Sequence, residues 1–191
     1  MLDKALQFTS TALNQFLKNT FSLNEDKVVM NNLISPNGDI PDENKNKIVL
    51  SLLNIEQETN KQFYGRNKQL DDGGYVNVNP TERFNLDLLF SANFQDYTET
   101  LKFLNATIQF FQANSTIDRT KQASLPENID RLNFDLEKVS YHEMHSLWSA
   151  MGAKYQPSVI YKLRLVTIQA DQTIQSIPYV KGIGKTAAPE L

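Results

Sequence analysis

Residues 47–56, KIVLSLLNIE, constrain the fold more than any other segment, because they are apolar on both alternating sets of positions. The two sets are Ile48, Leu50 and Leu52 on one side and Val49, Leu53 and Ile55 on the other. A strand with one wet face alternates apolar and polar side chains, so this run predicts a strand that is covered on both faces. We therefore expect 47–56 to be central in a sheet.

Other segments carry the patterns of further strands. Residues 83–93 alternate, with Phe84, Leu86, Leu88 and Phe90 on one face and Asn85, Asp87, Leu89 and Ser91 on the other. In 131–138 the residues Leu132, Phe134 and Leu136 alternate with Asn133, Asp135 and Glu137. Both segments are predicted to be strands with one wet face. Residues 27–30 predict a short strand, and 158–169, SVIYKLRLVTIQ, predict the last strong one.

Three segments have helical spacing. Residues 2–18 predict an amphipathic helix. A second helix begins after Asp96, a suitable N-cap, and its predicted apolar stripe is Tyr97, Leu101, Leu104, Ile108 and Phe111. Ser140 is predicted to cap a short helix through Met151, which Gly152 ends as a C′ glycine.

The order of these elements is α, β, β, β, α, β, α, β. Helices and strands are interspersed without strict βαβ repetition, so we predict an α+β fold in which a mixed sheet has its helices packed mainly on one face. The length of 191 residues and the hydrophobic share of 40% suit one domain. We assign that domain to 1–170 and treat 171–191 as a C-terminal arm, whose Ile174, Ile177 and Val180 can add a strand to a sheet edge of this chain or of a neighbour.

Residues 57–81 form the longest polar stretch, and they contain Asp71-Asp72-Gly73-Gly74. The stretch is longer than most connections in compact domains, so it is either an excursion hairpin or a mobile functional loop. We favour the hairpin. The adjacent acids Asp71 and Asp72 are typical of turns and do not indicate catalysis.

Charge and composition narrow the classes of function. Nineteen Lys and Arg oppose 22 Asp and Glu, for a net charge of −3, so the basic surface of a nucleic-acid-binding protein is missing. The absence of Cys excludes disulfides, thiolate metal sites and cysteine nucleophiles. The N-terminus does not have the pattern of a signal peptide, and no apolar run approaches a membrane span, so we expect synthesis in the cytoplasm and no direct membrane insertion.

Motifs that carry chemistry are weak. His142 and His145 are spaced three apart, but the chain has no third His or Cys to complete a zinc site. Residues 182–186, GIGKT, end like a phosphate-binding loop, yet Tyr179 stands where that motif needs its first Gly. No G-x-S-x-G turn occurs. We predict no catalytic, cofactor-binding or metal-binding residue, and therefore no enzyme.

Residues 147–168, LWSAMGAKYQPSVIYKLRLVTI, resemble a known family. It is the cap, or tail-terminator, family of phage-tail-like extracellular contractile injection systems, of the antifeeding-prophage and virulence-cassette type. The blocks 1–8, 44–56, 88–94 and 101–114 are similar as well, in the family's order, so the resemblance covers about 1–170.

This resemblance implies a structural protein. Such a subunit has an α+β fold, assembles as a sixfold ring on the last layer of inner tube and sheath, stops polymerisation and closes the distal end. It implies a homohexamer, tube and sheath proteins as partners, and a place in an assembled particle that is released extracellularly. No catalytic motif comes with the family.

Partner contacts are predicted in residues 57–81 and in the C-terminal tail. The candidate residues are Tyr64, Arg66, Asp71, Asp72 and Tyr75 in 57–81, and Ile174, Ile177 and Tyr179 in the tail. Two alternatives stay open: another collar or adaptor component of the same kind of particle, and a small hydrolytic or ligand-binding enzyme that uses 57–81 as a lid. An enzyme predicts a deep pocket with converging polar groups, whereas a cap predicts edges and loops around a ring axis.

Overall fold

The computed structural model describes most of the chain and forms two compact units. The described residues are 2–58, 67–69, 75–78, 82–120, 122, 124–126, 129, 131–168 and 173–177. The main unit takes in residues 1–58 and 83–167, and the small unit takes in 59–82 and 168–191.

A six-stranded sheet organises the main unit, in the order β1-β2-β5-β8-β7-β6. Its strands are β1 (Val28–Met30), β2 (Lys47–Gln57), β5 (Glu82–Asn93), β6 (Thr116–Asp118), β7 (Arg131–Leu136) and β8 (Ser158–Ile168). The pair β1–β2 is parallel, whereas β2–β5, β6–β7 and β7–β8 are antiparallel. The mixed sheet predicted from the sequence is confirmed, and the short strand β6 is an addition to it.

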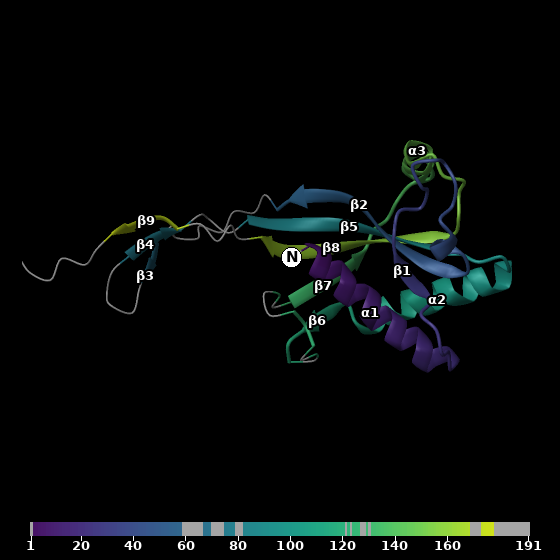
Figure 1. The fold of residues 1–191 in the computed structure, drawn as a ribbon, viewed down its shortest axis with the longest axis horizontal. Helices are drawn as coiled ribbons and strands as arrows, with labels where there is room; N and C mark the ends of the chain where they lie inside the picture. The colour runs from purple at the N-terminus through teal and green to yellow at the C-terminus, as the bar shows by residue number, and fades with distance from the viewer. Residues whose placement is uncertain are drawn as a thin grey trace, which may run out of the picture. The chain divides into compact units, whose positions relative to one another are not determined.

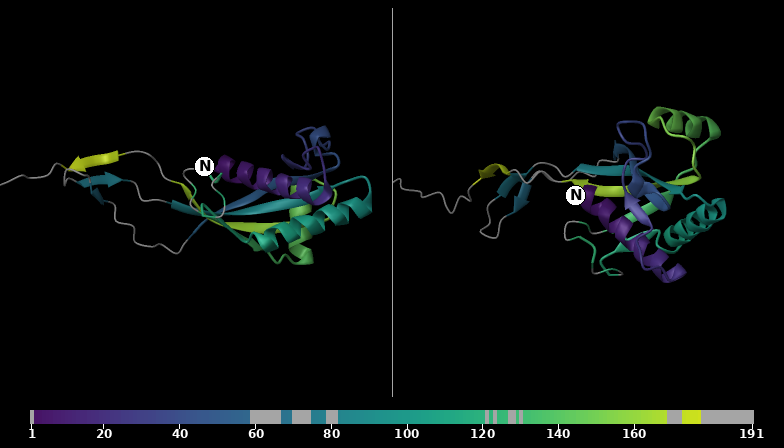
Figure 2. Two further views of the ribbon diagram at one scale, coloured as in Figure 1. Left: turned by 90° about the horizontal axis from the view of Figure 1, so that it is seen from below. Right: turned by 45° about the vertical axis from the view of Figure 1, so that its right-hand side comes forward.

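Three helices cover the two faces of this sheet unequally (Figure 1). Helices α1 (Leu2–Phe21) and α2 (Tyr97–Ala113) pack with Ile48, Leu50 and Phe90 on one face. Helix α3 (Tyr141–Met151) packs through Trp148 on Val49 and Leu89 of the other face. Figure 2 shows α3 separated from α1 and α2 by the strands. The predicted α+β fold, with helices mainly on one face, is confirmed.

One buried polar side chain fixes α1 to the sheet. Asn14 Oδ1 accepts hydrogen bonds from the backbone N–H groups of Lys27 and Val28, both at 2.8 Å, and its Nδ2 donates to Val28 O at 3.0 Å. The amide thereby continues the hydrogen bonding of β1 on the side away from β2. Buried polar groups are stable only when they are paired in this way.

The predicted roles of two strands are exchanged in the structure. Strand β2, expected to be covered on both faces, is buried only from Ile48 to Leu50, where β1 lies beside it. Strand β5, expected to have one wet face, is fully buried on both sides at Leu89, Phe90 and Ser91. The burial of Ser91 is possible because its Oγ donates to Gln156 Oε1 at 2.8 Å.

A β-bulge divides β2 into two halves. Leu52 is opposite Leu88 and Asn54 is opposite Asp87, so Leu53 is an extra residue between them. One extra residue shifts the alternation, and every later side chain changes face. Ile55, expected on the side of Val49, therefore lies on the side of Leu52. The polar residues Asn54 and Glu56 come to the face that carries α3.

Helix α2 buries only part of the predicted stripe: Phe111 is buried and Leu104 packs against the core, but the rest of the buried side differs. Its N-cap is Asp96, as expected, and the buried side is built on Phe103, Ala106 and Phe110. Tyr97 and Leu101 are exposed instead. The rings decide the rotation, because Phe103 stacks on Phe94 with centroids 4.5 Å apart.

The other local predictions have mixed outcomes. Ser140 caps α3 in a capping box with Glu143, and Gly152 ends the helix at φ +66°, as predicted.

In β7 the residues Leu132 and Phe134 are buried as expected, but Leu136 is exposed. Leu136 is the last residue of its strand.

The small unit contains one three-stranded sheet in the order β3-β4-β9. Its strands are β3 (Asn67–Gln69), β4 (Tyr75–Val78) and β9 (Thr173–Ile177). The antiparallel pair β3–β4 confirms the hairpin expected within 57–81. Strand β9 pairs antiparallel with β4, so the tail of the chain pairs with its own hairpin.

Candidate interaction surfaces

The predicted partner-contact residues fall in or near the small unit. Tyr75 of β4 and Ile177 of β9 are directly opposite each other in the backbone ladder, and Ile174 lies in β9. The structure thus brings two segments together that are about a hundred residues apart in sequence. Five candidates, Tyr64, Arg66, Asp71, Asp72 and Tyr179, lie outside the described residues. Contact with a partner stays a prediction for all eight.

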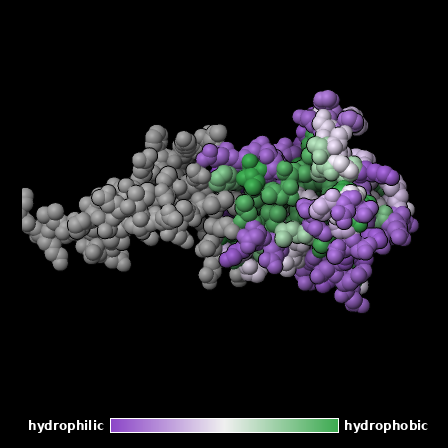
Figure 3. All heavy atoms as spheres, turned by 45° about the horizontal axis from the view of Figure 1, so that its top comes forward, coloured by the Kyte–Doolittle hydropathy of each residue, from purple (hydrophilic) through white to green (hydrophobic). Residues whose placement is uncertain are grey.

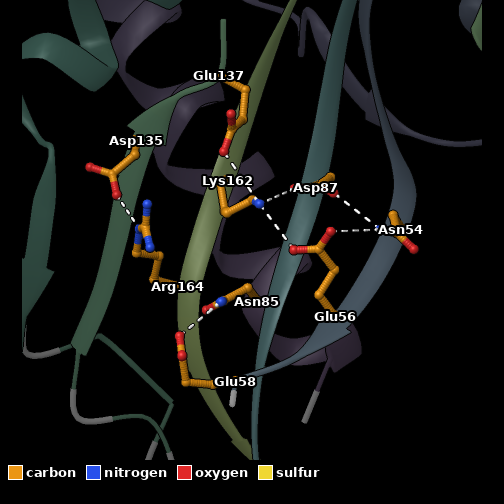
Figure 4. Close-up of polar contacts among 9 residues, drawn as sticks. All are labelled: Asn54, Glu56, Glu58, Asn85, Asp87, Asp135, Glu137, Lys162 and Arg164. Carbon is orange, nitrogen blue, oxygen red and sulfur yellow. Dashed lines mark hydrogen bonds and ion pairs between the residues drawn. The ribbon is translucent and has the colours of Figure 1, made fainter. Parts of the chain in front are cut away.

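A network of charged side chains lies on the sheet face that carries α3, and sequence reasoning missed it (Figure 4). Lys162 of β8 is its centre. The Nζ atom lies 3.0 Å from Glu56, 3.6 Å from Asp87 and 3.4 Å from Glu137. These contacts raise the pKa of Lys162, and the hydrogen bond to Glu56 is the largest cause. The cation therefore links β2, β5 and β8 to the residue that follows β7.

Five more residues extend this network. Asn54 donates to Glu56 and Asp87 at 3.3 Å, and Asn85 donates to Glu58 at 3.0 Å. Arg164 Nε pairs with Asp135, which raises the pKa of the guanidinium. Among the nine residues drawn in Figure 4, five carboxylates meet two cations. This polar network is therefore acidic on balance.

The bulge at Leu53 explains how β2 contributes to the network. Without the extra residue, Asn54 and Glu56 would face the apolar core that α1 and α2 cover. The sequence of β8 carries a signal for this network, because Lys162 and Arg164 alternate with apolar residues in YKLRL and so share one face of the strand. The position of the bulge has no such signal, because SLLNIE reads as an unbroken strand.

Helix α3 and its flanking loops form an aromatic groove of about 610 Å³. Met144 and Trp148 line its inner wall, and Tyr141 and Tyr155 stand exposed beside it. Trp148 and Tyr155 meet edge to face at 5.5 Å. Trp, Tyr and Met are the residue types that protein interfaces favour, so the groove has the composition of a contact surface.

A second groove, of about 660 Å³, lies beside α1 and is completed by the end of α2 and by Gln122, Ser124 and Pro126 after β6. Phe8, Phe16 and Phe110 contribute apolar surface, and its polar residues are mainly amides, such as Gln15 and Asn114. Lys4 is its single titratable lining residue among those described. The acid, base and nucleophile that an enzyme active site requires do not converge in this groove.

The two histidines of the sequence are exposed on α3. Within the described residues, no group of three or more His, Cys, Asp or Glu side chains is placed to hold a metal ion. Of the helices in the same residues, none is long and apolar enough to cross a membrane.

One family model and several solved structures match the chain. The model of the Pvc16 N-terminal domain matches residues 9–181. A solved sheath/tube terminator of a PVC extracellular contractile injection system, in the extended state, is similar, with a TM-score of 0.58 and 13% identity over 95% of this chain. The tube-terminating cap of the anti-feeding prophage is similar too, with a TM-score of 0.55 and 12% identity over 94% of this chain.

These two solved structures share the fold, and the chain spans 64% and 60% of their respective lengths. No curated protein sequence matches the chain significantly. The family model covers most of the chain and agrees with the resemblance carried by residues 147–168. The chain belongs to the Pvc16 N-terminal domain family.

Proposed function

We propose that this chain is a structural cap that ends the inner tube and sheath of a contractile injection particle. The family match over 9–181 is the observation that carries the proposal. The fold supports it, because both similar structures are terminators, one of a sheath and tube and the other of a tube. The proposal assigns the chain no enzymatic activity.

The surfaces of the main unit suit such a role. A terminator must bind the last layer of a polymer and offer no surface that accepts the next polymer subunit. The acidic network around Lys162 and the aromatic groove of α3 lie next to each other on one sheet face. We assign this face, with its acidic part and its aromatic part, to contacts with neighbouring subunits of a ring or with the particle.

The small unit is the second part of the proposal. We assign its hairpin and the arm 171–191 to contacts between the ring and the particle. The pairing of β9 with β4 supports this assignment, because it gives the tail and the hairpin one common sheet. The edges of such a small sheet can accept further strands.

Deletion of the gene tests the function. In its absence nothing blocks the growing end, so we expect tubes and sheaths of uncontrolled length or very few stable particles. Electron micrographs of purified particles give the length distribution, and a strain complemented with the intact chain is the control. Particles of normal length with normal ends in the deletion strain contradict the proposal. Normal lengths with a missing collar would instead indicate an adaptor component.

Recombinant protein tests the oligomeric state. Light scattering is expected to give the mass of six copies when particle ends are present as a template. Truncation after Gln169 removes β9 and the residues that follow it. The truncated chain is expected to keep the melting temperature of the main unit and to lose binding to particle ends. Retained binding contradicts the role assigned to the small unit.

A further inference from the structure

The outer edge of β2 is unpaired over half of the strand's length. Strand β1 pairs only with Ile48, Val49 and Leu50, and the last backbone bond on this side runs from Asn31 N to Leu50 O at 3.2 Å. From Leu52 to Gln57, none of the described residues pairs with the backbone on that side. Unpaired edges are sites where another chain can add a strand.

Backbone geometry shows which groups this edge offers. Glu58 donates its N–H to Arg83 O at 2.8 Å, toward β5. Backbone groups of alternate residues in an antiparallel ladder point to opposite sides. The N–H and C=O groups of Gln57 and Ile55 therefore point away from β5, toward the unpaired side.

Exposed apolar side chains border the same edge. Leu52 is 39% exposed, Ile55 is 43% exposed and Met30 is 46% exposed. Met30 is opposite Leu50 and shares its face with Leu52, and the bulge at Leu53 brings Ile55 to that face as well. Figure 3 brings the β2 side of the molecule forward and shows hydrophobic residues gathered on the visible surface.

The other face of this edge is acidic. Glu56 and Asn54 lie there, beside Asp87 and the rest of the network around Lys162. A second copy that paired through the same edge would bring two acidic faces together, which is unfavourable. A segment with cations on this face and aliphatic side chains on the other complements both faces.

We propose that Leu52–Gln57 is a strand-addition site for an extended segment of a partner protein in which aliphatic residues alternate with Lys or Arg. Main-chain hydrogen bonds from Ile55 and Gln57 would hold the segment, and its aliphatic side chains would cover Leu52 and Ile55. Its basic side chains would reach Glu56. This proposal concerns the main unit and does not depend on the role in the particle.

A synthetic peptide tests the site directly. The probe is a fluorescein-labelled peptide of alternating valine and lysine, and its affinity for the full chain is measured by fluorescence anisotropy. We expect binding that weakens as salt is added. A peptide with glutamate in place of lysine should bind at least about tenfold more weakly. On binding the basic peptide, the backbone amides of Ile55 and Gln57 should become protected from hydrogen exchange.

Two variants locate the site. Ile55→Lys adds a charge to the edge and should weaken binding of the basic peptide at least about tenfold. Leu101→Lys is the matched control, because Leu101 is 47% exposed but lies on α2. It should bind the peptide as the parent does, and melting curves confirm that both variants fold.

The proposal would be overturned by no binding of the basic peptide at about 1 mM, by binding that Ile55→Lys leaves intact, or by binding without protection of the two amides. Equal loss in both variants would overturn it as well, because the effect would then be one of charge alone.

Discussion

Replacing Lys162 by Met removes the cation at the centre of the polar network while its apolar stem is kept. The side chain of Lys162 is 18% exposed and meets three carboxylates within 3.6 Å. After the change, Glu56, Asp87 and Glu137 remain close together without this partner. Repulsion among them is expected to destabilise the links among β2, β5, β8 and the end of β7.

The expected loss of unfolding free energy in Lys162→Met follows from the distances between Lys162 and the carboxylates and from the exposure of its side chain. At an effective dielectric constant of about 20, a charge pair at about 3.5 Å has a Coulomb energy of about 5 kcal/mol, most of which desolvation offsets. Loss of one partner from a buried pair costs about 3–5 kcal/mol. The site is partly exposed and therefore screened, so we expect Lys162→Met to cost about 2 kcal/mol. That corresponds to a fall of about 4–8 °C in melting temperature for a chain of this size.

The dependence on pH gives a second test. The folded-state pKa of Lys162 lies above its ordinary value of 10.5, so its contribution is fully present below that value and is lost as the pH rises through the folded pKa. Chemical denaturation gives the free energy of unfolding of parent and variant. The difference between the two should therefore be constant from about pH 7 to pH 9 and smaller above about pH 10.5.

Lys45→Met is the control, because Lys45 makes a single exposed pair with Asp42 at 2.5 Å. Its melting temperature should stay within about 1 °C of the parent. A cost below about 0.5 kcal/mol for Lys162→Met, or a difference that does not change at high pH, would refute the reasoning.

Other predictions concern the local features of the main unit. Asp96→Ala removes the cap that accepts from Thr98 N and Glu99 N and should lower the melting temperature. Hydrogen bonds from the backbone N–H groups of Glu99 and Thr98 lower the pKa of Asp96. The destabilisation caused by Asp96→Ala should therefore be present when the pH is above 3.8, the ordinary pKa of this carboxyl, and should vanish as the pH falls through the folded pKa. Gly152→Val should cost about 1–3 kcal/mol because of the positive φ, and a neutral result in denaturation would contradict this. Changing His142 and His145 together to Gln should alter stability by less than about 1 kcal/mol and leave the metal content unchanged; zinc that elemental analysis finds only in the parent would contradict this.

Local signals in the sequence predicted the ends of elements well. The N-caps Asp96 and Ser140 and the C-terminal Gly152 depend on neighbouring backbone groups, which the sequence places within a few residues. The fold class followed from the order of periodic segments. These features require no knowledge of distant partners.

Features that depend on distant partners were not predictable. Ser91 is buried because Gln156, which is far away in sequence, accepts its hydrogen bond. The bulge at Leu53 is set by the register with β5, and it decides which side chains of β2 join the Lys162 network. The face that α2 buries is likewise set by rings from α1 and from the segment after β5. Hence the predicted partner-contact residues, chosen from sequence alone, did not include the polar network.

The position of the chain on a particle tests the central claim most directly. Particles are purified from cells in which the chain carries a short peptide tag, and antibody-bound gold marks the tag in electron micrographs. A terminator should give gold at one end of each particle. Gold along the whole length, or at both ends, would contradict the account.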